Sequence, residues 1–199
     1  MLVALRTALA SRLLHLAALL LLSCAAANAQ PESEQAWIDI SLDTQGRVTR
    51  AAVQQQPPSV TSDLESWVMA TSFDPPAVNA EPVPSTTSVS VEFSLQDAES
   101  GHGLKVLSHT TGPRPVSIKE PKYPHSDRKK GLEGWVQMIV TINADGDVTD
   151  AQVTRSSNES FEHDALKAIK HWKYKVPTVN GRAIGTATEQ TVFFRLDQS

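Results

Sequence analysis

Apolar and polar side chains alternate along residues 135–142, where the apolar positions of one parity are Val136, Met138, Val140 and Ile142. A period of two predicts a β-strand with one strongly apolar face. Asp145-Gly146 follows this strand, and glycine tolerates the positive φ that a tight hairpin turn requires. The stretch therefore predicts a β-hairpin.

The return strand has its apolar residues at Val148, Ala151 and Val153. Because the spacing changes between 148 and 151, we expect a bulge or a strong twist there. After residue 158 the period becomes helical, with apolar residues at Phe161, Ala165, Ala168, Ile169 and Trp172. Asn158 or Ser160 can cap the start of this helix. We expect the helix to cover the apolar face of the hairpin.

The same pattern occurs earlier in the chain. Ile38, Ile40 and Leu42 correspond to Met138, Val140 and Ile142, and Gly46 corresponds to Gly146. After one inserted residue the correspondence continues to the closing strand, where Val91, Phe93 and Leu95 match Val192, Phe194 and Leu196. Such a sustained offset predicts a tandem duplication. The helix of the first copy, expected around 61–71, has a weaker pattern.

The residues between the two copies are rich in Gly, Pro, Ser and Thr, and 97–118 is therefore expected to be a linker. The second copy begins with Tyr123-Pro124, a short helix over 125–130 and a capping glycine at 131. Its last strand is expected over 186–196, with Val192, Phe194 and Leu196 inward. Thr191, Phe193 and Arg195 then face outward.

Residues 1–29 have the composition of an export signal. Leu13 to Leu22 is an apolar core, and Ala27-Asn28-Ala29 is a small-x-small cleavage site. Two alternatives stay open. Leu21-Leu22-Ser23-Cys24 is similar to a lipoprotein box with Cys24 as the acylated residue, and the segment could also remain as an uncleaved anchor. The predicted organisation is a signal over 1–29, a first domain over 30–96, the linker over 97–118 and a second domain over 119–199.

Composition excludes several classes of function. A formal net charge of −4 argues against a nucleic-acid binder with a basic footprint. The histidines lack the spacing of a zinc site, and no serine or cysteine stands in a nucleophile motif. We therefore expect no enzyme activity, no cofactor and no metal.

The second copy resembles the C-terminal domain of TonB-family proteins. The resemblance covers residues 119–196 in full and 36–95 more weakly, without the Tyr-Pro opening. The residues that carry it are Tyr123, Pro124, Gly131, Gly134, Asp145, Gly146, Ser156, Ser157, His171, Trp172, Tyr174, Pro177, Gly181, Val192, Phe194 and Leu196.

This resemblance implies an α+β fold, in which a three-stranded antiparallel sheet carries two helices on one face. It also implies a periplasmic location and a role similar to that of energy transducers that pull on outer-membrane receptors. The receptor would offer a short extended segment that pairs with an exposed strand. One departure is that only a few residues separate Ala29 from the first copy, whereas transducers have a long proline-rich spacer.

The predicted binding site is the edge of the last strand, because an edge strand has unpaired N–H and C=O groups. The side chains nearest a partner strand would be Thr188, Gln190, Thr191, Phe193 and Arg195. The expected partner is an envelope protein or an outer-membrane receptor peptide. The alternative is a structural or assembly module that forms a homodimer through its sheet edges. Contact with a membrane is expected only if Cys24 is lipidated or the signal stays uncleaved.

Overall fold

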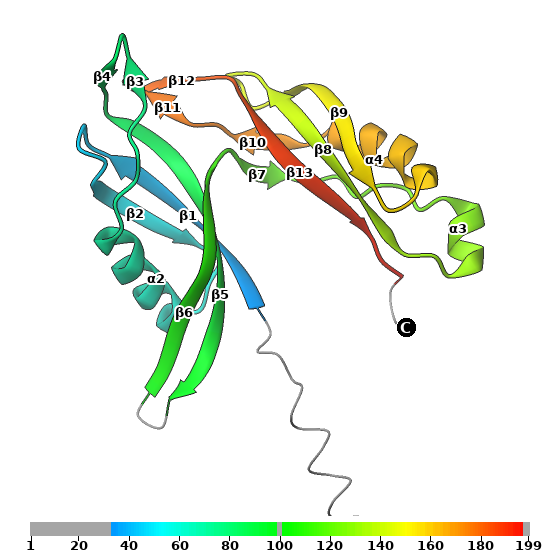
Figure 1. The fold of residues 1–199 in the computed structure, drawn as a ribbon, viewed down its shortest axis with the longest axis horizontal. Coiled ribbons are helices and arrows are strands. Elements are labelled where there is room, and N and C mark those ends of the chain that lie inside the picture. The colour runs from blue at the N-terminus through cyan, green and yellow to red at the C-terminus, as the bar shows by residue number, and fades with distance from the viewer. Residues whose placement is uncertain (1–32, 99–100, 197–199) are drawn as a thin grey trace, which may run out of the picture.

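The computed structural model describes residues 33–98 and 101–196, of which 96–98 and 101–102 are described by their backbone alone. Two sheet-and-helix units lie next to each other and form an arch (Figure 1). The expected export signal, Cys24 and the cleavage site at Ala29 lie outside the described residues.

Up to Ala98, the first unit contains the three strands of the expected sheet, one helix and a small hairpin. Its elements are β1 (Ser33–Leu42), β2 (Val48–Gln54), α2 (Pro58–Ala70), the small hairpin β3 (Ala77–Val78) and β4 (Glu81–Pro82), and β5 (Ser85–Ala98). Strand β1 pairs antiparallel with β2 on one side and β5 on the other. Helix α2 begins at Pro58, three residues before the predicted start, because the fixed φ of proline suits the first helical position.

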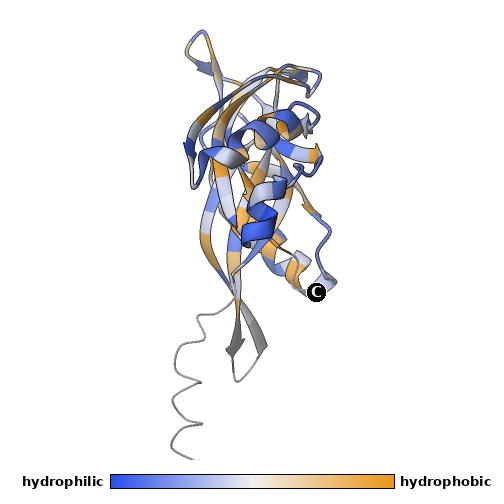
Figure 2. Ribbon diagram, turned by 90° about the vertical axis from the view of Figure 1, so that its right-hand side faces the viewer, coloured by the Kyte–Doolittle hydropathy of each residue, from blue (hydrophilic) through white to orange (hydrophobic). Residues whose placement is uncertain are grey.

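Helix α2 covers one face of this sheet. Val60, Leu64 and Val68 recur at helical spacing and pack against the apolar parity of β1 and β5, including Ile38 and Phe93. The alternation of hydrophobic and hydrophilic residues along the strands is visible in Figure 2. The polar residues that alternate with them along the same strands lie on the other face of the sheet.

The second unit follows the predicted order. Its elements are α3 (His125–Lys130), β8 (Gly134–Ile142), β9 (Val148–Ser156), a 3₁₀ turn (Glu159–Phe161), α4 (Glu162–Ile169), β10 (Lys173–Lys175), the small hairpin β11 (Thr178–Val179) and β12 (Arg182–Ala183), and β13 (Thr186–Phe194). Strand β8 lies between β13 and β9, and all three are antiparallel. The core contains Val136, Met138, Phe161, Ile169 and Phe194.

Two local expectations have different outcomes. Ile142 pairs with Val148 and Thr141 pairs with Asp150, so Thr149 is the extra residue of a bulge, as predicted. The helix, expected to continue to Trp172, ends at Ile169. Its last turn tightens, because the N–H of Trp172 donates to the carbonyl of Ile169 at 3.0 Å.

The segment expected to be a linker forms two strands, so the prediction for 97–118 was wrong in this respect. Strand β6 (Gly101–Gly112) pairs with β5, and β7 (Arg114–Ser117) pairs with β10. Leu104 and Val106 of β6 pack against the first core. Apolar burial and ladder hydrogen bonds together favour a strand over a free connection.

The sheet of the first unit is larger than the three strands expected. Strand β11 of the second unit pairs with the beginning of β5, and β6 pairs with the rest of the same border. The result is a six-stranded sheet, with β12, β11, β5, β1 and β2 in order and β6 beside β5. The expectation of two equivalent three-stranded sheets therefore does not describe the first unit.

Asp39 on the polar face of β1 joins the units by ion pairs. Its carboxylate accepts from Arg114 at 3.1 Å and from Lys175 at 2.8 Å, and Ser88 also donates to it. Burial acts to raise the pKa of Asp39, but the hydrogen bonds from Arg114, Lys175 and Ser88 together outweigh it and lower the pKa. Together with the β11–β5 pairing, these bonds fix the units relative to each other.

Candidate partner-binding edge

The outer edge of β13 is the open strand border of the second unit that faces the arch (Figure 1). Among the described residues, β13 pairs only with β8, along Thr186–Phe194. In the first unit, the closing strand β5 is paired on both borders. An open strand border offers N–H and C=O groups that another strand can satisfy.

Side-chain hydrogen bonds identify which backbone groups point to the open edge. The carbonyl of Thr191 accepts from Gln190 Nε2 at 3.1 Å, and the carbonyl of Glu189 accepts from Thr188 Oγ1 at 3.4 Å. In an antiparallel strand, the N–H and C=O of one residue point the same way, and successive residues alternate. Glu189, Thr191 and Phe193 therefore present their backbone groups to the open edge.

The five predicted side chains are divided between the two faces of the sheet. Thr191, Phe193 and Arg195 have the parity of the open face, and the guanidinium of Arg195 lies over the Phe193 ring at 5.1 Å. Thr188 and Gln190 share the parity of buried Val192. The Tyr174 hydroxyl donates to Gln190 Oε1 at 3.4 Å, and burial raises the pKa of Tyr174.

The open face next to this edge also has apolar residues outside the five predicted site residues. Phe193 pairs across the strands with Trp135, and Glu189 pairs with Ile139. Phe193 is 54% exposed and Ile139 is 48% exposed. The alternation along 135–142 already placed Trp135 and Ile139 on the outer parity. A strand added to β13 would therefore lie beside Phe193, with Trp135 and Ile139 one strand further in.

Tyr123 supports β13 from the core side, and Pro124 leads into α3. The Tyr123 ring meets Phe161 and Phe194 edge-on, each with centroids 5.8 Å apart. Its hydroxyl donates to the Leu132 carbonyl, and Pro124 immediately precedes α3. Tyr123 thus helps to fix Phe194, whose neighbour Phe193 lies on the open face.

The remaining motif residues are structural. A Cβ on Gly134 would lie 2.2 Å from Ser157 Oγ, and one on Gly146, at φ +82°, would lie 2.1 Å from the Tyr174 carbonyl. Trp172 Nε1 donates to the Lys119 carbonyl at 2.9 Å, which ties the entry segment to the core. Pro177 accepts from the N–H of Ile184 at 3.0 Å, at the base of the β11–β12 hairpin.

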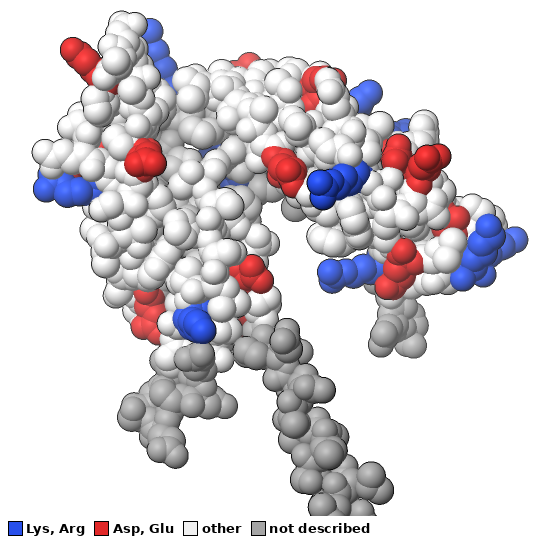
Figure 3. All heavy atoms as spheres, in the orientation of Figure 1, with Lys and Arg blue, Asp and Glu red and all other residues white. Residues whose placement is uncertain are grey.

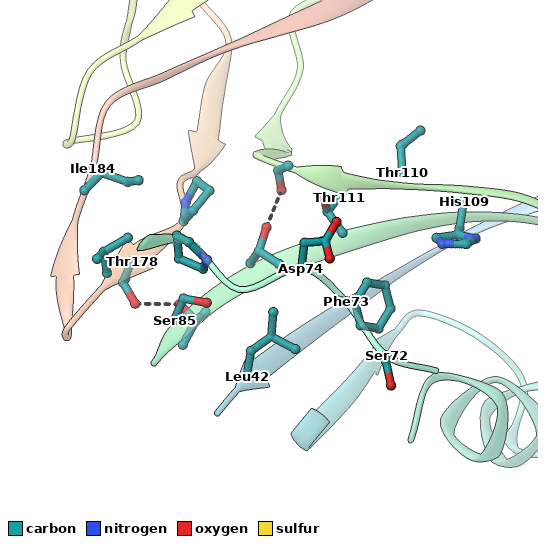
Figure 4. Close-up of a pocket in the computed structure, with 16 residues that line it drawn as sticks. Leu42, Ser72, Phe73, Asp74, Ser85, His109, Thr110, Thr111, Thr178 and Ile184 are labelled. Atoms are coloured by element: carbon teal, nitrogen blue, oxygen red, sulfur yellow. Dashed lines mark hydrogen bonds between the residues drawn. The ribbon is translucent and has the colours of Figure 1, made fainter. Parts of the chain in front are cut away.

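A separate open hollow of about 630 Å³ lies where the β11–β12 hairpin meets the first unit (Figure 4). Leu42, Phe73 and Ile184 line it together with threonines of β5, β6 and β11. The hydroxyls of Thr86 and Thr178 are 2.8 Å apart across this junction. The ionisable side chains of its lining are Asp74 and His109, which come from different segments. The hollow therefore lies at the contact between the two units, and its lining does not form a cluster of ionisable side chains.

Three further observations bear on function. Within 33–98 and 101–196, no group of three or more His, Cys, Asp or Glu residues is placed to hold a metal ion. In the same part of the chain, every helix is too short or too polar to span a bilayer. On the face drawn in Figure 3, acidic and basic residues are scattered in small groups.

Comparison with known proteins concerns the second unit. The family described as Gram-negative bacterial TonB protein C-terminal matches residues 119–196. Protein TonB of Xanthomonas campestris pv. campestris is 34% identical over 82 residues, which are 41% of this chain and 37% of that protein. Protein TonB of Vibrio cholerae is 32% identical over 79 residues, 39% of this chain and 32% of that protein. The chain thus spans about a third of the length of these relatives.

A solved structure is also similar to this chain. The solution NMR structure of the Pseudomonas aeruginosa TonB C-terminal domain is 25% identical, with a TM-score of 0.38. The similarity covers 44% of this chain and 89% of that one.

Proposed function

We propose that this chain is a non-enzymatic TonB-family protein of the cell envelope that binds an extended segment of a partner by strand addition to β13. The partner is an envelope protein or an outer-membrane receptor, and the binding serves energy-dependent transport across the outer membrane. The match of residues 119–196 to the TonB C-terminal family supports this proposal. The open edge of β13 and the outward backbone groups of Glu189, Thr191 and Phe193 support the mode of binding.

The observation that carries the proposal is the contrast between β13 and β5. Both are the closing strands of their units, and both follow a small hairpin. Strand β5 accepts β6 along residues 88–98 in antiparallel orientation, and it accepts β11 at Ser85 and Thr86. A closing strand of this fold therefore accommodates an added strand. Strand β13 has the same place in its unit and an open border.

The first unit is, in this proposal, a degenerate copy of the second. Gly46 at φ +76° and Gly146 at φ +82° occupy matching turns. The N–H of Phe73 donates to Gly46 and that of Tyr174 donates to Gly146, both at 2.9 Å. Leu104 and Val106 of β6 pack on the first core, and Tyr123 packs on the second. Strand β6 thus compensates for the missing Tyr-Pro opening.

The decisive experiment replaces Thr191 by proline. Proline removes the outward N–H while the neighbouring residues keep their bonds to β8, and edge strands tolerate it. The matched control is Thr191→Val, which keeps the N–H and a similar volume. Affinity capture from envelope extract, quantified by mass spectrometry, should recover the same partner with wild type and Thr191→Val. Recovery of that partner at an undiminished level with Thr191→Pro would refute strand addition.

One observation favours a second function, that of a structural module. Strand β11 already pairs with β5 across the two units, with Thr178 opposite Thr86. The same edge-to-edge pairing between copies would build a homodimer through β13. Sedimentation velocity separates the two functions, because the module predicts a dimer at micromolar concentration and Thr191→Pro would dissociate it.

The predicted export signal over 1–29 supports a periplasmic location, and a product cleaved after Ala29 is the proposed form. Lipidation at Cys24 and an uncleaved inner-membrane anchor are the alternatives. Mass spectrometry of the mature N-terminus distinguishes them, because each form has a different mass. Detection of an acylated Cys24 would replace the soluble form by a lipid-anchored one.

A further inference from the structure

A cleft of about 480 Å³ separates the open end of β13 from the first unit. Phe193 and Arg195 line one side of it. Residues of β1, β5 and β6 line the other side, namely Ser33, Glu34, Gln35, Ser90, Glu92, Ser108, His109 and Thr110. Figure 3 shows the surface hollowed between the two units on the side to which the β13 edge faces. The volume lies within the range of ligand-binding clefts, about 300–1,000 Å³.

The first-unit side of this cleft is a polar wall. Gln35 pairs with Glu92, and Glu92 pairs with Ser108, so the three residues lie side by side on the face that points away from α2. Gln35 Nε2 donates to Ser90 Oγ at 2.8 Å, and Ser108 Oγ donates to Glu92 Oε2 at 3.0 Å. These hydrogen bonds order the wall and leave Glu92 exposed to the cleft.

The charges of the two sides differ. Glu92 is the carboxylate on this face of the wall, since Glu34 pairs with Phe93 and has the parity of the face toward α2. Among the described residues, no Lys or Arg of the first unit lines the cleft. The β13 side has Arg195, whose guanidinium is held over the Phe193 ring. A ligand that lies between them meets negative charge on the wall and an aromatic ring beside β13. A basic side chain toward the wall and an apolar side chain beside Phe193 complement these surfaces.

The distance between wall and strand is fixed by the fold. Asp39 lies on the same polar face of the first sheet and holds Arg114 and Lys175 of the segments that lead into and through the second unit. Strands β11 and β5 are hydrogen-bonded at the top of the arch. The wall therefore stands at a set position in front of β13.

We propose that the first unit recognises the partner: an extended segment added to β13 lies inside this cleft and presents a lysine or arginine to Glu92. This inference rests on the proposed strand addition and adds the chemistry of the partner segment. The selected partner has an apolar residue beside Phe193 and, on the same face of the added strand, a basic residue that reaches Glu92. The first unit thus supplies selectivity, and β13 supplies the backbone hydrogen bonds.

The test uses the purified full chain and three fluorescein-labelled nine-residue peptides in fluorescence anisotropy. The peptides have valine followed two residues later, on the same face of the extended strand, by lysine, by glutamine or by glutamate. An exposed ion pair contributes modestly, so the lysine peptide should bind about two- to fivefold more tightly than the glutamine peptide at low salt, and the glutamate peptide should bind most weakly. The preference should fall as salt rises.

Three variants separate the two proposals. Glu92→Gln should keep binding of the glutamine peptide and lose most of the preference for lysine. Glu81→Gln, an exposed carboxylate on β4 that does not line the cleft, changes the net charge equally and should keep the preference. Thr191→Pro should weaken all peptides at least tenfold. A benzophenone in place of one lysine should crosslink to the wall residues of β5 or β6.

Each contrary result has a definite meaning. An unchanged lysine preference in Glu92→Gln, or crosslinks confined to the second unit, would show that the first unit does not select the partner. Strand addition to β13 would be unaffected by either result. Undiminished binding to Thr191→Pro, or the absence of binding to all three peptides at millimolar concentration, overturns both proposals. A dimer that Thr191→Pro dissociates would assign the β13 edge to a second copy of the chain. It would also overturn the proposal that the first unit recognises a partner segment.

Discussion

Replacing Gly146 by alanine tests the hairpin that supports β13. Gly146 has φ +82°, and an added Cβ would lie 2.1 Å from the Tyr174 carbonyl oxygen, closer than any real contact. The backbone of residues 173–175 would have to move. That movement would strain the hydrogen bond from the Tyr174 N–H to the Gly146 carbonyl, now 2.9 Å.

Gly131 is the matched control. It has φ +66°, and nothing lies within 4 Å of an added Cβ. Alanine at 131 should therefore cost only the left-handed backbone strain, about 1–2 kcal/mol. Alanine at 146 should lower the stability of the second unit by the same backbone strain and by the loss of the hydrogen bond, about 1 kcal/mol. The displacement of β10 should lower it further. We therefore expect Gly146→Ala to lower the free energy of unfolding of the second unit by about 3 kcal/mol or more.

The measurement is hydrogen exchange by mass spectrometry along a urea series, because it reports each unit separately. Peptides that cover β8 and β9 give the opening free energy of the second unit, and peptides from β1 and β2 serve as an internal reference. We expect Gly146→Ala to lower the opening free energy of the second unit by at least about 1 kcal/mol more than Gly131→Ala does. Equal losses would show that the contact with Tyr174 does not constrain the turn.

Three further predictions concern the core and the unit junction. Tyr123→Ala should destabilise the second unit by about 2–4 kcal/mol in urea unfolding, because it removes the ring from Phe161 and Phe194, whereas Tyr123→Phe should cost about 1 kcal/mol. Leu104→Ser should release β6 and raise the exchange rate of β5 amides at 88–98 by tenfold or more, leaving β13 unchanged. The pKa of Asp39 is lowered in the fold, so its stabilising effect is complete above the ordinary value of 3.8 and is lost as pH falls through the folded-state pKa. Small-angle scattering should then show the units loosening below about pH 4, and Asp39→Asn should show the same loosening at pH 7; unchanged scattering in that variant would contradict the role of Asp39.

Much of the second unit was predictable from its sequence. Alternation, the Asp145-Gly146 turn and the spacing change after Val148 are local signals, and each determines a local structure. The helix end was not predictable, because Trp172 keeps the helical spacing while its indole is drawn toward the Lys119 carbonyl. The sequence also placed the candidate edge on 188–195, but the division of its side chains between two faces became clear only from the fold.

The strand formed by the expected linker shows a different limit. Residues 101–112 are rich in Gly, Ser and Thr, which favour turns when considered alone. The border of β5 supplies ladder partners, and the first core receives Leu104 and Val106. Both are distant contacts, which local composition does not report. The cleft between the units has the same origin, since its two sides come from residues far apart in the chain.

The pairing of β11 with β5 has a consequence for how the chain folds. The border of β5 at Ser85 and Thr86 is paired only once Thr178 and Val179 of β11 are in place. A strand late in the chain therefore completes a sheet whose first strand is β1. Contacts between such distant residues form late, because the intervening chain must first be ordered. During synthesis the first sheet therefore remains incomplete at one corner until β11 has been made and can pair with β5.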